Sequence, residues 1–334
     1  MTGGPSPVTG NPLGAARSGL SSYEFVMIWN HRMYHYYAHG LAITSELACP
    51  ELVATRPNGH APDVTIRLGE TPGALTTPTS QSVLYQAKPN QFLLTIPHIA
   101  RFWVQEGKQI TIEPMAGSHE DAIRLFLLGS ALGALLHQRG RVILHGSAVA
   151  TAYGAMVFVG LSGAGKSTLA AALQQRGYRV LTDDVCSIVY DQATQTAQVQ
   201  PGLAHLKLWA DAAKELALTD QATRRVRPEL EKYALPLHHT FDLAPVRLDT
   251  VYQLQPTNGS AWQIEVLSTM PKMQALIMNT YRQRFLQGLG TRPQQLQQLS
   301  QIAGQVRFCR VTRPSSGFQL PELVERLVTD WTRS

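Results

Sequence analysis

The chain has 334 residues, of which 44% are hydrophobic and 16% charged, so it carries enough apolar sequence for a large core and wholesale disorder is excluded. This length predicts two domains, or one large domain with an extension. The formal charge of +6 favours an acidic partner such as a nucleotide. Because the basic residues are scattered and do not alternate with aromatics, no nucleic-acid partner is expected.

Cysteine usage and the N-terminus predict a soluble cytoplasmic protein without a membrane partner. Cys49, Cys186 and Cys309 are widely spaced and form no CxxC pair, which favours a reducing compartment. Residues 1–20 are rich in Gly, Pro and Ser without an apolar run, so they predict a disordered tail rather than a signal peptide or anchor. The most apolar helix-like run, Leu125–Leu136, is too short to span a bilayer. A homo-oligomer remains open.

The segment from residue 21 to residue 116 is predicted to be a β-rich N-terminal domain. Val64, Ile66 and Leu68 alternate with polar residues, and residues 109–113 repeat this pattern. The turn-forming stretches between the predicted strands are 56–59, 71–82 and 106–108.

From residue 117 to residue 334 the pattern predicts an α/β domain. Ser118 is predicted to cap a helix that has acids in its first turn and runs through His137. Two fully apolar runs follow, at 142–144 and 156–159. A helix from Gly165 to Arg176 and a short strand then complete a strand–loop–helix–strand unit, which implies a parallel sheet. The later elements are predicted strands at 251–254 and 264–267, and predicted helices at 294–303 and 322–331.

The segment Gly160–Ser167 matches the phosphate-loop pattern GxxxxGK[ST] in full. Glycines let several backbone N–H groups converge on a phosphate, and the positive end of the following helix points at the same anion. Lys166 would place a cation on the phosphates of ATP, and the Ser167 hydroxyl would bind Mg²⁺. A glycine-rich turn without a ligand is the alternative. The predicted nucleotide-binding residues are Gly160, Ser162, Gly163, Ala164, Gly165, Lys166, Ser167 and Thr168.

Asp183 and Asp184 follow a short apolar strand, at the edge of a sheet where α/β proteins bind ligands. One carboxylate there can hold Mg²⁺ through water, and the other can accept the proton of an attacking hydroxyl. Neighbours on a strand point to opposite faces, so both reach the phosphate only if the backbone turns. The alternative is that Asp184 caps a loop. His145, at the predicted end of the strand before the phosphate loop, would lie beside them, although a single His is more often structural.

These residues carry a family resemblance. His145, the phosphate loop, the run Arg176–Arg179 and the pair Asp183–Asp184 resemble the catalytic domain of HPr kinase/phosphorylase over residues 144–188. The string LHGSAV before the loop and the later EKY are more similar to the HPr-kinase-related proteins of peptide biosynthetic clusters, which include lasso-peptide precursor kinases.

The resemblance implies a P-loop domain of the HPr kinase type, with a role for each matching residue. Lys166 would bind phosphate, Ser167 would bind Mg²⁺ and Asp183 would assist the metal site. Asp184 would be the general base, and His145 would support both aspartates. HPr kinases carry Glu where this chain has Thr168, and their later acidic motif has no counterpart around residues 201–209. These departures disfavour phosphorylase activity and an HPr substrate. Lys207, in that stretch, is a candidate for phosphate contact.

The leading function is therefore an ATP- and Mg²⁺-dependent kinase acting on a serine of a peptide or protein, by resemblance near the C-terminus of a lasso-type precursor. A kinase of a free small molecule such as serine, or of an HPr-like protein, is an alternative. A non-catalytic ATP-sensing module is another, which the adjacent aspartates disfavour because a pure sensor needs no base.

Three further sequence patterns give weaker predictions. His31, His35 and His39 recur every fourth residue, but the surrounding tyrosines favour a strand that would hold the imidazoles far apart, which disfavours a metal site. The basic run Arg224–Arg227 predicts a solvated surface, or a flap closing on phosphate or an acidic peptide. The residues predicted to form a core stripe are Leu296, Leu299 and Ile302.

Overall fold

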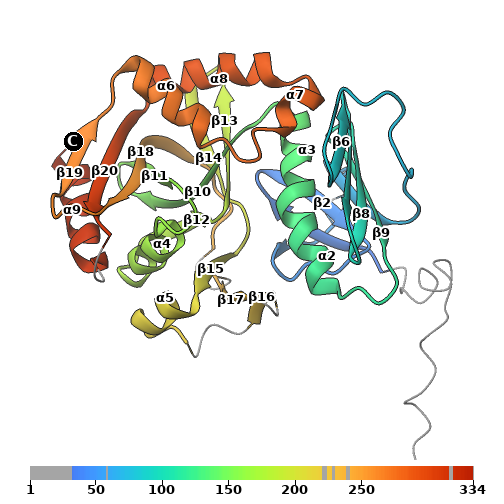
Figure 1. Cartoon of the computed structure of the whole chain (residues 1–334), viewed down its shortest axis with the longest axis horizontal. Helices are drawn as coiled ribbons and strands as arrows, with labels where there is room; N and C mark the ends of the chain where they lie inside the picture. The colour runs from blue at the N-terminus through green and yellow to red at the C-terminus, as the bar shows by residue number, and fades with distance from the viewer. Residues whose placement is uncertain are drawn as a thin grey trace, which may run out of the picture.

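The protein has a mixed α/β fold built on two large sheets and one small sheet (Figure 1). The computed structural model describes residues 32–57, 59–219, 224–227, 230–237, 241–315 and 319–333. The predicted tail, residues 1–20, and His31 lie outside the described residues.

The first sheet has nine strands in the described part of the chain, in the order β3-β1-β2-β4-β9-β8-β7-β6-β5. The predicted alternation at 64–68 and 109–113 gives strands whose apolar residues enter the core beside Phe92 and Phe102. The bounds are β1 Tyr34–Ala38, β2 Leu41–Ser45, β3 Val53–Ala54, β4 Val64–Leu68, β5 Ser80–Gln81, β6 Tyr85–Lys88, β7 Gln91–Ile96, β8 Ala100–Gln105 and β9 Gln109–Pro114.

The predicted helix through His137 lies between the two large sheets (Figure 1). It consists of α2 (Glu120–Phe126), the π-helical turn η1 (Leu127–Ala131) and α3 (Leu132–Gln138), and its apolar residues share the core of the first sheet. The predicted Ser118 cap is wrong, because His119 occupies the N-cap position and makes no side-chain capping bond.

The second sheet is mixed, in the order β11-β10-β13-β14-β18-β20-β19, with β12 also paired to β10. The predicted apolar strands are confirmed, and the predicted parallel sheet is partly correct, because β11–β18 and β18–β20 are parallel pairs and the others are antiparallel. β11 and β12 run in the same direction, yet β10 pairs antiparallel with both, because a tight hairpin joins β10 to β11. The bounds are β10 Val142–Thr151, β11 Gly154–Val159, β12 Arg179–Thr182, β13 Val185–Asp191, β14 Thr196–Gln200, β18 Val246–Thr257, β19 Gln263–Val266 and β20 Arg307–Pro314.

Helices cover both faces of the second sheet, which explains why β11 is apolar and buried along its whole length. The helices α4 (Lys166–Gln175) and α9 (Leu320–Arg333) pack in one core, and α6 (Thr269–Met278) and α8 (Arg292–Gln305) pack in the other. The helix α7 (Phe285–Leu289) packs against the first sheet.

The two predicted C-terminal helices are confirmed as α8 and α9, but the predicted core stripe of α8 is only partly correct. Leu299 and Ile302 are buried, whereas Leu296 is 38% exposed and Gln295 takes the inward position before them.

The small sheet has the order β15-β17-β16 and carries two stretches that the sequence singled out. β15 (His205–Trp209) contains Lys207 and leads into α5 (Ala210–Glu215), while β17 (Leu230–Pro236) contains the EKY string. The basic run Arg224–Arg227 forms strand β16, which pairs antiparallel with β17.

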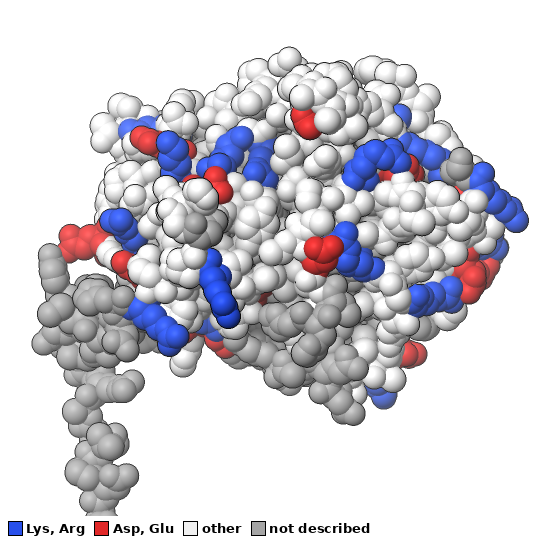
Figure 2. Space-filling view, turned by 180° about the vertical axis from the view of Figure 1, so that it is seen from behind, with Lys and Arg blue, Asp and Glu red and all other residues white. Residues whose placement is uncertain are grey.

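The helices and the charged surface residues bear on the expected absence of membrane and nucleic-acid partners. Among the described helices, none is long and apolar enough to cross a membrane. On the face shown in Figure 2, basic and acidic side chains are interspersed over a mostly uncharged surface.

His39 and His137 are buried histidines whose protonation should weaken the fold. Burial lowers the pKa of His39 to about 3, and neither ring nitrogen has a hydrogen-bond partner. Burial likewise lowers the pKa of His137 to about 4, despite the opposing effect of a 2.8 Å contact between Nε2 and the Tyr281 carbonyl. In the unfolded chain histidine titrates near 6.5, so below that pH only the unfolded state takes up these protons and stability falls.

We therefore expect each of these histidines to remove about 2 kcal/mol of unfolding free energy between pH 7 and pH 5. In urea unfolding, His39→Asn should reduce this pH-dependent loss by the contribution of one histidine. The matched control is His98→Asn, because His98 also has a positive φ but is exposed. An unchanged pH dependence in His39→Asn would contradict the prediction.

Candidate functional site

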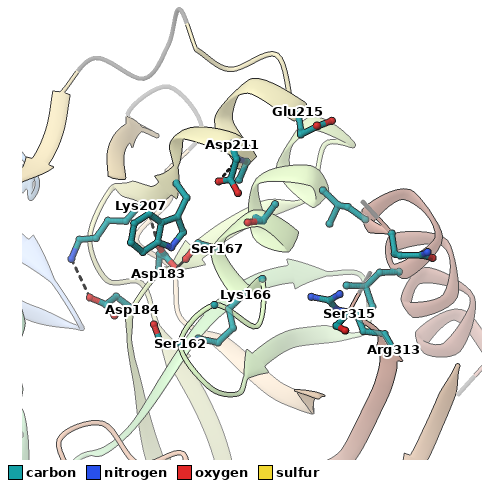
Figure 3. A pocket seen from close by; sticks show the side chains of 18 of the residues that line it. Ser162, Lys166, Ser167, Asp183, Asp184, Lys207, Asp211, Glu215, Arg313 and Ser315 are labelled. Atoms are coloured by element: carbon teal, nitrogen blue, oxygen red, sulfur yellow. Dashed lines mark hydrogen bonds and ion pairs between the residues drawn. The ribbon is translucent and has the colours of Figure 1, made fainter. Parts of the chain in front are cut away.

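A cavity of about 550 Å³ lies where the phosphate loop, the aspartate pair, β15, α5 and the start of α9 meet (Figure 3). This volume is in the range of small-molecule binding sites. The residues that line the cavity come from segments far apart in the sequence, so only the tertiary fold brings them together. Of the predicted nucleotide-binding residues, those lining the cavity are Ser162, Gly163, Gly165, Lys166, Ser167 and Thr168.

The phosphate loop connects β11 to α4 as the motif predicts. Gly165 occupies the N-cap of α4 with a φ of 93°, and Gly160 begins the loop with a φ of 141°. A Cβ at Gly160 would lie 2.6 Å from the Leu254 carbonyl oxygen, so this position requires glycine on two grounds. Gly160 and Ala164 are not among the residues that line the cavity, so they shape the loop from behind.

Lys166 is buried against the loop that it follows. Its ammonium donates 3.0 Å hydrogen bonds to the carbonyl oxygens of Gly160 and Leu161. These two bonds place the ammonium group at the phosphate loop, where the motif predicts a cation.

The Asp183 carboxylate accepts hydrogen bonds from three other segments of the chain. Its Oδ1 accepts hydrogen bonds from Ser167 Oγ at 2.8 Å and from Ser147 Oγ at 2.7 Å. Its Oδ2 accepts the backbone N–H of Lys207 at 2.9 Å. The side chain is thus fixed by the phosphate-loop helix, by β10 and by β15 at once, and the residue is only 3% exposed.

The backbone turns at Asp184, which meets the condition that the sequence left open. Asp184 has a φ of 71°, in the left-handed region that Asp tolerates better than most residues, and the Val185 N–H donates to the Asp183 carbonyl. The turn separates the two carboxylates while leaving both on the cavity wall. Asp184 therefore does more than cap a loop.

Asp184 contacts two basic side chains, the ammonium of Lys207 and the imidazole of His145. Its Oδ2 lies 3.1 Å from Lys207 Nζ, and its Oδ1 lies 3.3 Å from His145 Nδ1. Burial alone would raise the pKa of this carboxyl, but the Lys207 ammonium and then His145 outweigh it and hold the pKa well below its usual range. The same pair raises the pKa of Lys207 against the opposing effect of burial. Asp184 is therefore a carboxylate at neutral pH.

His145 contacts Asp184 as the sequence predicted, but its place in the strand differs from the prediction. It lies within β10 rather than at its end, at the residue where β10 stops pairing with β13 and begins to pair with β11. The change of partner occurs at Gly146, where a Cβ would lie 2.4 Å from the Phe158 carbonyl oxygen. The LHGSAV string thus places His145 and Ser147 on two sides of a strand junction.

Sequence reasoning missed the full roles of Ser147, Lys207 and Arg313. Ser147 is in the LHGSAV string, so its position gave a signal, but only the fold shows its bond to Asp183. Lys207 was a candidate for phosphate contact, and the structure adds its pairing with Asp184. Arg313, at the end of β20, donates to the Ala164 carbonyl at 3.0 Å, and no local pattern marks it.

The donor set fits a magnesium ion held largely by substrate and water. Ser167 and Asp183 supply hard oxygen atoms in direct contact, and Mg²⁺ is usually bound by one or two such ligands together with phosphates and water. Among the described residues, no group of three or more His, Cys, Asp or Glu side chains is arranged to hold a metal ion. His35 lies in β1, and His39 in the turn that follows it.

Comparison with known proteins gives little independent support. No protein-family model matches the chain, and no curated protein matches its sequence. Among solved structures, it is similar to the HPr(Ser) kinase/phosphatase from Coxiella burnetii, at 12% sequence identity and a TM-score of 0.30. The match covers 57% of this chain and 95% of that one.

The loop geometry predicts that two glycine-to-alanine substitutions will differ in their effect on stability. Gly160→Ala combines a positive φ with a collision against the Leu254 carbonyl, so it should lower the unfolding free energy by about 2–3 kcal/mol. Gly163→Ala has a positive φ but meets no atom within 4 Å, so its cost should be about 1 kcal/mol. Equal losses in denaturant unfolding would contradict the assignment.

Proposed function

We propose that this protein is an ATP- and Mg²⁺-dependent kinase that transfers a phosphoryl group to a serine hydroxyl of a peptide. The observation that carries the proposal is that the two adjacent aspartates contact different partners. In one cavity, Asp183 contacts the Ser167 hydroxyl of the phosphate loop, whereas Asp184 contacts the side chains of Lys207 and His145 instead.

The Asp183 side of the cavity fits the metal. Ser167 and Asp183 would hold Mg²⁺, which would neutralise the negative charge of the ATP phosphates, while ATP would supply the phosphoryl group and leave as ADP. The bonds from Ser147 and from the Lys207 N–H fix the Asp183 carboxylate before any ligand arrives. Such preorganisation reduces the reorganisation needed at the moment of reaction.

The Asp184 side fits the acceptor. A carboxylate whose pKa lies below its usual range cannot remove a serine proton before attack. It can accept a hydrogen bond from the hydroxyl, align it for attack and take the proton late, as suits a loose transition state. Most of the rate would then come from positioning and from the charges of Lys166 and Lys207.

A serine-containing peptide is the proposed acceptor because the sequence resembles precursor-peptide kinases. The runner-up is a free small molecule such as serine, which the same two carboxylates would serve equally well. An ATP sensor is disfavoured, because it would need no carboxylate positioned apart from the metal side.

The direct test incubates the protein with Mg·ATP and either candidate precursor peptides or free serine, and follows products by mass spectrometry. A peptide that gains one phosphoryl group supports the proposal. Transfer only to free serine would identify a small-molecule kinase, and tight ATP binding without transfer to any acceptor would favour the sensor.

Lys166→Ala and Asp184→Asn should each reduce turnover by about 10²-fold or more, because each removes one charge or base from the reacting centre. Circular dichroism and thermal unfolding should show that both variants remain folded. Transfer by Asp184→Asn at the wild-type rate would exclude Asp184 as the base.

Lys207 should affect turnover more than nucleotide binding. Lys207→Met removes the ammonium that holds Asp184 but keeps the backbone N–H on Asp183, so kcat should fall about tenfold or more while the KM for Mg·ATP changes little. Lys207→Arg retains a cation and should recover part of the loss. Lys214→Met is the matched control, because Lys214 is exposed on α5 outside the cavity. An unchanged kcat in Lys207→Met would contradict this role.

A further inference from the structure

The cavity extends beyond the phosphate loop on the side away from Asp184. Figure 3 shows Asp184 and Lys207 on one side of Lys166, and Arg313 and Ser315 on the other. This second end is lined by Arg313 at the end of β20 and by Ser315 just after it. Gln319, just before α9, and Leu320 and Leu323, in its first turn, line it from the other side. None of these residues takes part in the chemistry proposed above.

Arg313 is a desolvated guanidinium without an acidic partner among the described residues. Its two terminal nitrogens donate 3.0 Å hydrogen bonds to the carbonyl oxygens of Ala164 and Pro314, and its Nε is buried without a partner. Burial lowers its pKa, and no carboxylate opposes that effect. The side chain is therefore held rigidly beside the phosphate loop. Burying its charge there costs free energy that its two hydrogen bonds do not offset.

The fixed orientation limits what Arg313 can bind. Both terminal nitrogens donate to main-chain oxygens, so few N–H groups are left to bind a phosphate or carboxylate in the usual bidentate way. The flat face of the guanidinium remains, and such a face stacks well on aromatic rings. Leu320 and Leu323, which are 8% and 3% exposed, add apolar surface beside it.

The position of Arg313 at the end of β20 agrees with a role in stacking on a flat ring. β11, which leads into the phosphate loop, is parallel to β18, and β18 is parallel to β20. The carboxyl ends of β11 and β20 therefore open on the same edge, where α/β sheets bind elongated ligands. A nucleotide with its terminal phosphate toward Asp184 would extend its base toward Arg313.

We infer that Arg313, Leu320 and Leu323 form a subsite for the nucleobase, which packs its flat ring against the guanidinium and the two leucines. This inference rests on the proposed function, because it assumes a nucleoside triphosphate on the phosphate loop. It assigns to β20 and α9 the recognition of a nucleotide over a bare polyphosphate.

The test compares the binding of Mg·ATP with that of Mg·tripolyphosphate by isothermal titration calorimetry on the full chain. The measured quantity is the ratio of the two dissociation constants, because damage to the phosphate loop affects both and cancels. Wild-type protein should bind Mg·ATP about tenfold or more tightly than Mg·tripolyphosphate, since stacking of one base on a guanidinium or aromatic plane contributes at least that much.

Two variants probe the subsite. Ser315→Trp adds bulk to an exposed lining residue and should bring the ratio close to one by weakening Mg·ATP alone. Arg313→Lys keeps the charge but removes the planar face, so it should also lower the ratio. Ser300→Trp is the matched control, because Ser300 is an exposed residue on α8 outside the cavity, and its ratio should equal that of the wild type.

The outcomes separate this inference from the proposed function. Tight wild-type binding of both ligands with a ratio near one would overturn the base subsite and leave the phosphate site standing. Binding of neither ligand would overturn the proposed function and the subsite with it. An equal loss of both ligands in Ser315→Trp would show that this end of the cavity holds phosphate, which also overturns the subsite.

Discussion

The site depends on the Asp183 carboxylate, which accepts hydrogen bonds from three segments that are distant in the sequence. The phosphate-loop helix, β10 and β15 each contribute one donor, through Ser167, Ser147 and the Lys207 N–H. A buried carboxylate is costly unless its lone pairs are satisfied, so these bonds are a condition for burying it. Once they form, the relative positions of the three segments are set.

That constraint explains why Asp184 is available for a different task. With Asp183 held, the left-handed turn at the next residue brings Asp184 to Lys207 and His145. Lys207 donates a hydrogen bond to each carboxylate, from its backbone N–H to Asp183 and from its ammonium group to Asp184. Because Lys207 lies on β15, the small sheet is coupled directly to the aspartate pair. The EKY string on β17 and the basic run on β16 belong to the same sheet.

The cavity joins two kinds of chemistry on either side of one loop. Its Asp184 end holds paired charges suited to proton and phosphoryl transfer, and its Arg313 end combines a flat cation with leucine side chains. The phosphate loop between them is shaped by glycines and held by Lys166 and Arg313, which both donate to its carbonyl oxygens. The two ends are therefore separable by mutation, because they share the loop but not their side chains.

The sequence by itself determined the local features: the phosphate loop, the helix that follows it, the aspartate pair and the apolar strands, all of which depend on short-range patterns. It failed where distant segments decide the outcome. The antiparallel β10 between β11 and β12, the exposure of Leu296 and the interior position of His145 in β10 follow from which strands and helices become neighbours. The links from Ser147 and Lys207 to the aspartates and from Arg313 to the phosphate loop likewise belong to the tertiary structure, because hydrogen bonds across 23 to 149 residues leave no periodic signal in the chain.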